Sequence, residues 1–127
     1  NEYAASIMYT NYAAMVSGLF RQTLKPFFEG EISDEQGHAI YLAEKIATLG
    51  GTPTVSPAEV KQTTDVKEML ESAYQAEKET IDRYETRKKQ AEELGLTELV
   101  VKLEDLISDE TGHMEELGRI LADSRFE

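Results

Sequence analysis

A seven-residue pattern occurs twice in this chain, and no other feature constrains its fold as strongly. Residues 32–38 read Ile-Ser-Asp-Glu-Gln-Gly-His, and residues 107–113 repeat six of these seven identities 75 positions later. The same offset relates two further pairs, Glu2 with Glu77 and Tyr9 with Tyr84. The chain therefore contains two similar halves, each with a Glu, a Tyr seven residues later and a Glu-x-x-His motif further on.

Apolar residues around each motif recur in alternating steps of four and three. The first series is Phe28, Ile32, Glu35, Ala39, Leu42, Ile46 and Leu49, and the second is Leu103, Ile107, Glu110, Met114, Leu117 and Leu121. This spacing is typical of the buried seam of a helix in a bundle. A comparable stripe runs through Leu70, Ala73, Glu77, Ile81 and Tyr84. We predict helices at roughly 1–17, 22–49, 64–93 and 97–123, with Thr97 as the N-cap of the last.

One long linker separates the two halves. It begins at Gly50-Gly51-Thr52-Pro53, extends to about Thr63 and contains two of the three prolines. Fourteen extended residues span at most ~45 Å, whereas a 27-residue helix is ~40 Å long. The linker is therefore long enough to run the length of a helix. We predict an all-α four-helix bundle made of two helical hairpins joined by a long crossover.

The length of 127 residues suits a single domain covering 1–127. The repeat indicates an asymmetry within it, because Glu77 follows about a dozen predicted helical residues and Glu2 follows one. We therefore expect that the first helix is truncated at its N-terminus and belongs to a longer natural chain.

Composition excludes several classes of function. The chain has no cysteine, so disulfides, thiol chemistry and iron–sulfur clusters are ruled out. A formal charge of −12 argues against nucleic-acid binding, which needs a basic surface, and suits a surface that attracts cations. The absence of a long apolar run and of a signal-peptide pattern predicts a cytoplasmic protein without a membrane segment.

The glutamates on the apolar seams indicate metal binding. Burying a lone carboxylate is costly, so such groups are neutralised, paired or bound to a cation. His38 and His113 follow Glu35 and Glu110 by three residues and lie on the same helical faces. Glu2 and Glu77 are expected at matching depth on the other two helices. Four carboxylates balance two divalent ions, and oxygen ligands with one imidazole per ion suit iron or manganese, with zinc as a competitor.

At these residues the sequence resembles the ferritin-like superfamily of di-iron carboxylate proteins, and within it the bacterioferritins and the bacterioferritin-type miniferritins. The resemblance covers essentially the whole chain. It implies that Glu2 and Glu77 are terminal ligands of two iron ions, that Glu35 and Glu110 bridge them, and that His38 and His113 each complete one ion. It also implies a homo-oligomer that oxidises Fe(II) with O₂ or H₂O₂ and stores the product as mineral.

The sequence departs from this family in three ways. Gln36 stands where haem-binding bacterioferritins have a methionine ligand, so no haem is expected. The chain ends at Glu127 without a fifth helix, which leaves a clipped 24-subunit cage, a 12-subunit cage or a smaller assembly. The DNA-protecting miniferritins use a different ligand pattern between subunits, so their function is not expected here.

Two questions stay open at this point. Tyr9 and Tyr84 are expected to be core residues that donate a hydrogen bond to a ligand carboxylate, and Tyr9 is alternatively an electron donor during oxygen reduction. The function that the resemblance implies is ferroxidase and iron storage, and two alternatives stay open. One is a different di-iron oxidase or a peroxidase like the rubrerythrins without their cysteine-rich domain, and the other is a non-catalytic bundle that binds two metal ions.

Overall fold

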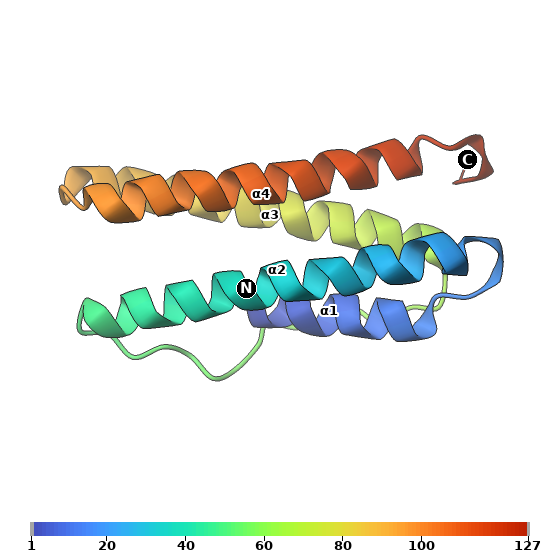
Figure 1. Cartoon of the computed structure of the whole chain (residues 1–127), viewed down its shortest axis with the longest axis horizontal. Helices are drawn as coiled ribbons and strands as arrows, with labels where there is room; N and C mark the ends of the chain where they lie inside the picture. The colour runs from blue at the N-terminus through green and yellow to red at the C-terminus, as the bar shows by residue number, and fades with distance from the viewer. Residues whose placement is uncertain (1, 127) are drawn as a thin grey trace. The chain divides into compact units, whose positions relative to one another are not determined.

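Four long helices make up most of the chain. The computed structural model describes residues 2–126, apart from the side chain of Ser124. The long helices are α1 (Glu2–Met15), α2 (Arg21–Thr48), α3 (Val66–Glu93) and α4 (Thr97–Leu121), and the short 3₁₀ helices are η1 (Gly18–Phe20) and η2 (Ser124–Phe126) (Figure 1). No strand occurs in the described range. The four predicted helices are all present, and their ends lie within two residues of the predicted ones.

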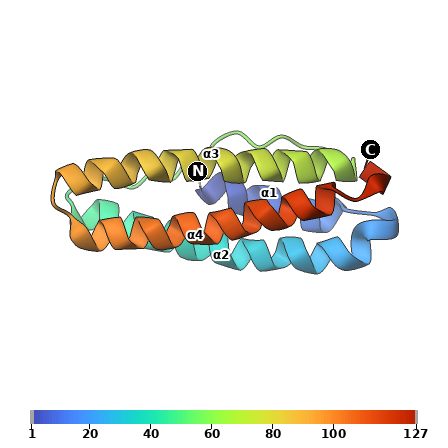
Figure 2. The ribbon, with the colours of Figure 1, turned by 90° about the horizontal axis from the view of Figure 1, so that it is seen from above.

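The chain divides into two compact units, Asn1–Met69 and Leu70–Glu127. In the first unit α1 and α2 lie side by side as an antiparallel hairpin, and in the second α3 and α4 do the same (Figures 1 and 2). Residues 51–65 form the connection and contain no helix. Each half of the sequence repeat is therefore one helical hairpin, as predicted.

Glycine ends two of the helices in the same way. After α2, Gly50 has a φ of 90° and the backbone N–H of Gly51 donates to the carbonyl of Ile46 at 2.9 Å. After α3, Gly95 has a φ of 70° and the N–H of Leu96 donates to the carbonyl of Ala91 at 3.0 Å. Both are Schellman ends, in which a left-handed glycine lets the chain turn back onto the last helical turn.

Charged side chains cap the end of α1 and the start of α3. The guanidinium of Arg21 donates to the carbonyls of Ala13, Ala14 and Val16 at the C-terminal end of α1, where a cation also complements the helix dipole. Asp65 caps α3, because its carboxylate accepts the N–H of Glu68 at 3.0 Å.

The predicted N-cap of α4 is wrong. Thr97 is already the first helical residue, and the N-cap is Leu96, which makes no side-chain capping hydrogen bond. The turn is instead formed by the Schellman end of α3, which continues directly into α4.

The buried face of α2 differs from the predicted seam. Its buried residues are Leu24, Phe28, Glu31, Glu35 and His38. Ile32 is only partly buried, and Ile46 and Leu49 are exposed. Beyond its middle, α2 continues past the start of α1 (Figure 1), so the C-terminal part of the predicted seam has no α1 residues beside it in the described chain.

The connection is attached to its own unit. The hydroxyl of Tyr12, a fully buried residue of α1, donates to the carbonyl of Lys61 at 3.5 Å. Across the described residues, none of the helices combines the length and the apolar character that a membrane crossing requires.

Candidate metal centre

The first unit brings three of the predicted ligands together. Glu2 comes from the first turn of α1, and Glu35 and His38 come from neighbouring turns of α2. All three are buried, with Glu35 only 1% exposed. The Nδ1 atom of His38 lies 3.6 Å from Glu2 Oε2 and 3.9 Å from Glu35 Oε2. One ligand atom from each of the three residues lies within 4.8 Å of the others.

The second unit repeats this arrangement. Glu77 lies in the middle of α3, and Glu110 and His113 lie on neighbouring turns of α4. The two carboxylates are 2% and 1% exposed. The Nδ1 atom of His113 lies 3.9 Å from Glu77 Oε1 and 3.9 Å from Glu110 Oε2. The repeat with its offset of 75 positions therefore places the same functional groups in both hairpins, namely two buried carboxylates beside one imidazole.

Each of these triads has the donor set and the charge of a divalent-cation site. Metal–nitrogen and metal–oxygen bonds of about 2.0–2.2 Å place two ligands of one ion no more than about 4.3 Å apart. The histidine–carboxylate distances of 3.6–3.9 Å fall within this range. Two carboxylates and a neutral imidazole carry a charge of −2, which one divalent ion balances. The residues present therefore fit the metal that the sequence predicts.

The ionisation of Glu2 is also favourable to a cation. Burial raises the pKa of the Glu2 carboxyl. The interactions of this carboxyl with His38 and Glu35 and the charge of the imidazole lower the pKa by more than burial raises it, so the pKa lies below the ordinary value of 4.5. The group is therefore a carboxylate at neutral pH, which is the form that binds metal.

The structure adds one residue that the sequence analysis did not single out. Glu31 lies one turn before Glu35 on α2, is buried with 7% exposure, and has a carboxylate oxygen within 4.8 Å of one from Glu35. The repeat contained a signal for it. The equivalent position in the second half is Leu106, which is also 7% exposed. Because the second half has a leucine at this position, the repeat indicates that the Glu31 side chain is buried.

The two tyrosines of the repeat are both core residues. Tyr9 is fully buried, and its ring lies against that of Phe28 with centroids 6.0 Å apart. Tyr84 is also buried, but within the described range its hydroxyl has no hydrogen-bond partner. The expected hydrogen bond from Tyr84 to a ligand carboxylate is therefore wrong.

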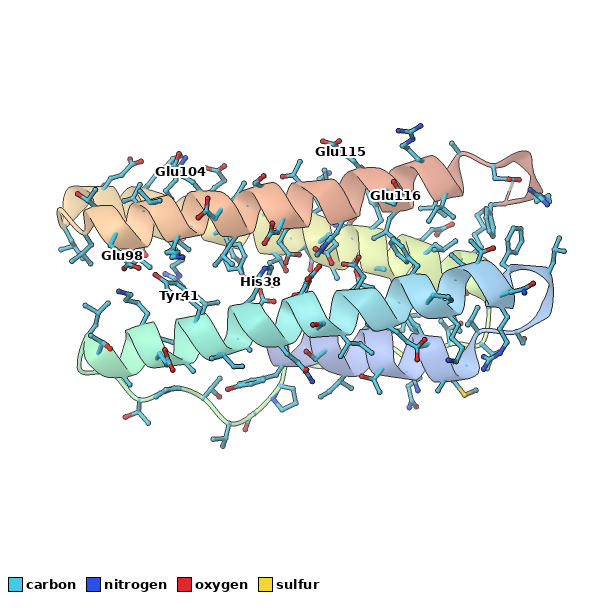
Figure 3. The ribbon with its side chains drawn as sticks, in the orientation of Figure 1. His38, Tyr41, Glu98, Glu104, Glu115 and Glu116 are labelled. Atoms are coloured by element: carbon cyan, nitrogen blue, oxygen red, sulfur yellow. The ribbon has the colours of Figure 1, made fainter. Side chains whose placement is uncertain are left out.

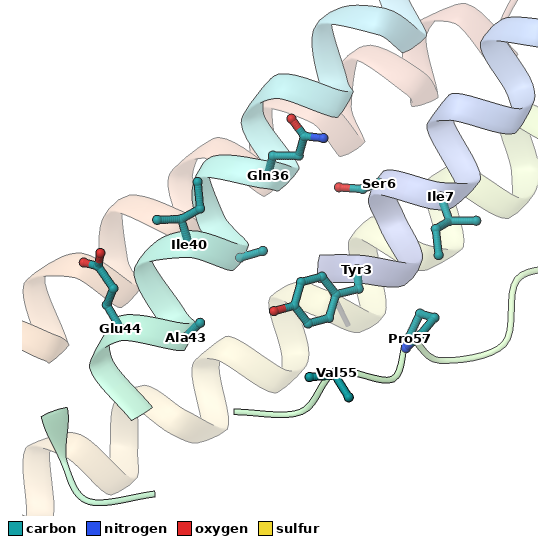
Figure 4. A pocket seen from close by; sticks show the side chains of 10 residues that line it. Tyr3, Ser6, Ile7, Gln36, Ile40, Ala43, Glu44, Val55 and Pro57 are labelled. Carbon is teal, nitrogen blue, oxygen red and sulfur yellow. The ribbon is translucent and has the colours of Figure 1, made fainter. Parts of the chain in front are cut away.

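A surface hollow of about 660 Å³ lies on the first unit, and the triad residues are not among those that line it (Figure 4). Apolar side chains of α1, α2 and the connection line it, among them Tyr3, Ile7, Ile40 and Val55. These four are between 36% and 94% exposed. Gln36 also lines this hollow. It is the residue that stands in place of a methionine haem ligand, which is why no haem is expected.

Helix α4 carries several exposed acidic residues. They include Glu98, Glu104, Glu115 and Glu116, which Figure 3 labels together with His38 of the first triad. Such a surface contributes to the formal charge of −12 and raises the local concentration of cations.

Comparisons with known proteins agree with this description. The family model of the ferritin-like domain matches residues 1–126. No match is found among curated proteins. A solved structure of ferritin-like, diiron-carboxylate proteins from Bacillus anthracis str. Ames is 71% identical, with a TM-score of 0.93, and the match covers 94% of this chain and 86% of that one.

Two more distant structures share the fold. A Dps protein from Bacillus brevis is 22% identical, with a TM-score of 0.87 over 95% of this chain and 87% of its own. A dodecameric thioferritin from Bacteroides fragilis, described as bacterioferritin-related, is 23% identical, with a TM-score of 0.86 over 96% and 78%. The predicted fold class, an all-α ferritin-like four-helix bundle, is thereby confirmed.

Proposed function

Because the chain belongs to the ferritin-like family, we propose that it is a ferroxidase whose two triads supply the ligands of one di-iron centre. The observation that supports this proposal most strongly is the duplicated set of buried ligands, Glu2, Glu35 and His38 in one hairpin and Glu77, Glu110 and His113 in the other. The relative that is 71% identical is described as a diiron-carboxylate protein.

The residues have distinct roles in this proposal. Glu2 and Glu77 are the terminal ligands, Glu35 and Glu110 are shared by both ions, and each histidine completes one ion. The histidine binds as the neutral imidazole, so it supplies a nitrogen donor without adding charge. Manganese or zinc would fit the same ligands.

The chemistry is a two-electron oxidation of bound Fe(II), which is the substrate as well as the resident metal. Two Fe(II) ions release two electrons, which with two protons reduce O₂ to H₂O₂ or reduce H₂O₂ to two water molecules. The protein holds both ions among buried anionic oxygens, which favour the higher charge of the Fe(III) product. The role of Tyr9 remains a proposal in either of its two forms, as a buried hydrogen-bond donor to a ligand carboxylate or as an electron donor.

We further propose that the chain forms a homo-oligomer, because mineral storage requires an enclosed volume. The hollow lined by Tyr3, Ile7, Ile40 and Val55 supports this proposal, since large apolar side chains exposed at one place are typical of a subunit interface. The number of subunits, the absence of haem and a cytoplasmic location stay predictions.

Aerobic titration with Fe(II) tests the proposed function. We expect rapid oxidation that continues well past two irons per chain and gives a soluble mineral, in a particle whose mass by light scattering is that of an oligomer. Oxidation that stops at two irons per chain would favour a di-iron oxidase or peroxidase. Binding of two ions without oxidation would favour a plain metal-binding protein.

A ligand variant makes the same test specific to the site. Glu35→Ala removes a shared ligand, so the fast phase of oxidation should fall by at least about 100-fold, while the helical circular dichroism is retained. Glu29→Ala is the matched control, because Glu29 lies on the same helix but is exposed and ion-paired with Lys25. Equal rates in wild type and Glu35→Ala would contradict the assignment of the site.

A further inference from the structure

The two halves of the chain differ at one buried position beside their ligands. Four residues before the motif glutamate, the first half has Glu31 and the second half has Leu106, and both are 7% exposed. The apolar residue is the ordinary choice for such a position, because a buried carboxylate loses its hydration and needs a compensating charge or hydrogen bonds. The first half therefore holds three buried carboxylates where the second holds two.

The position of Glu31 on α2 decides which cation it can reach. Glu35 lies between Glu31 and His38, with Glu31 one turn to one side and His38 one turn to the other. Glu31 and His38 are seven residues apart, which corresponds to about 10.5 Å along the helix axis. His38 and Glu2 define one cation position, so Glu31 lies on the far side of Glu35 from that position.

Glu31 is also close enough to Glu35 to share a cation with it. Oxygens of the two carboxylates lie within 4.8 Å of one another. Two ligands of one ion lie at most about 4.3 Å apart, so no more than a small rotation of either side chain is needed for both carboxylates to contact the same ion. Two carboxylates one turn apart with a cation between them avoid the repulsion that the pair has without it.

We propose that Glu31 is an additional metal ligand, which binds the ion that Glu35 shares on the side away from His38. This inference rests on the proposed function, because it requires that Glu35 contacts two ions. It makes the two metal positions unequal: one is held by the duplicated ligand set alone, and the other has an extra carboxylate. The more anionic position should bind a divalent ion more tightly and lose this advantage when Glu31 is neutralised.

Calorimetric titration of the metal-free protein with Co(II) under anaerobic conditions tests the inference, because Co(II) reports binding without turnover. We expect the wild-type chain to bind two ions. Glu31→Gln should still bind one ion as in the wild type and should bind the other about ten-fold or more weakly. Glu29→Gln removes the same charge from an exposed position of the same helix and should bind both ions as the wild type does.

A second variant separates a ligand from a packing residue. Glu31→Leu copies Leu106, so in the metal-free protein it removes a buried charge and should raise the melting temperature, while the rise caused by Co(II) becomes smaller. Wild-type affinities in Glu31→Gln, or a lower melting temperature in metal-free Glu31→Leu with unchanged Co(II) binding, would overturn the inference alone. A wild-type chain that binds fewer than two ions would overturn the proposed function as well.

Discussion

Buried carboxylates carry most of the functional information in this chain. Glu2, Glu31 and Glu35 in the first unit, and Glu77 and Glu110 in the second, are each less than 10% exposed. Each would cost several kcal/mol if it were ionised and uncompensated in the interior. The structure places an imidazole beside the motif glutamates, but an imidazole that serves as a metal ligand is neutral. We propose a bound cation as a compensation that the whole set can share.

Six of the proposed ligands were identified from the sequence because the repeat presents them as pairs. It did not predict Glu31, since the repeat pairs this residue with Leu106 and similarity between the halves was the signal in use. A difference between the halves at a buried position was the informative feature. Burial of position 31 became visible only when the face of α2 that points inward was known.

The lowered pKa of Glu2 leads to a prediction for the metal-free protein. The carboxyl should titrate below 4.5, because its interactions with His38 and Glu35 outweigh the effect of burial. Its contribution to stability is therefore present above the unfolded-state pKa and is lost as the pH falls through the lower folded-state pKa. A side-chain carboxyl NMR titration measures this value, and a midpoint above 4.5 would show that burial dominates instead.

The helices were predictable from spacing and from turn residues, whereas the orientation of α2 about its axis was not. Steps of four and three identify an apolar seam, but a helix has 3.6 residues per turn, so adjacent positions such as Glu31 and Ile32 both lie near the seam. The structure buries Glu31 and leaves Ile32 half-buried. Which of two neighbouring positions faces inward depends on packing partners that the sequence of one helix does not specify.

Glycines inside α2 and α4 give a prediction about helix stability. Gly37 and Gly112 precede the two histidines, and a Cβ at either position would meet nothing within 4 Å. Gly37→Ala and Gly112→Ala should therefore each stabilise the metal-free protein by about 0.4–1 kcal/mol, because alanine reduces the entropy of the unfolded chain.

Urea denaturation followed by circular dichroism measures this gain. Gly95→Ala is the control that should be destabilised, since Gly95 has a φ of 70° at the end of α3. Loss of stability in both helical variants would instead indicate that the backbone at these glycines is approached closely by another group.

At the level of the complete chain, two similar hairpins each carry half of a ligand set, and the net charge is −12. Without cations the negative charge of such a chain is poorly compensated, because its interior and its surface are both acidic. The duplicated residues support the proposal of two metal ions per chain, and the match of one family model to residues 1–126 shows the ferritin-like family.

The central claim is that two iron ions are held by the six residues of the two triads. Anomalous diffraction at the iron edge tests this claim most directly. Crystals grown anaerobically with Fe(II) should show two strong peaks per chain, one against Glu2 and His38 and the other against Glu77 and His113, with Glu35 and Glu110 contacting both. A single peak, or peaks only at exposed carboxylates such as those of α4, would contradict the account.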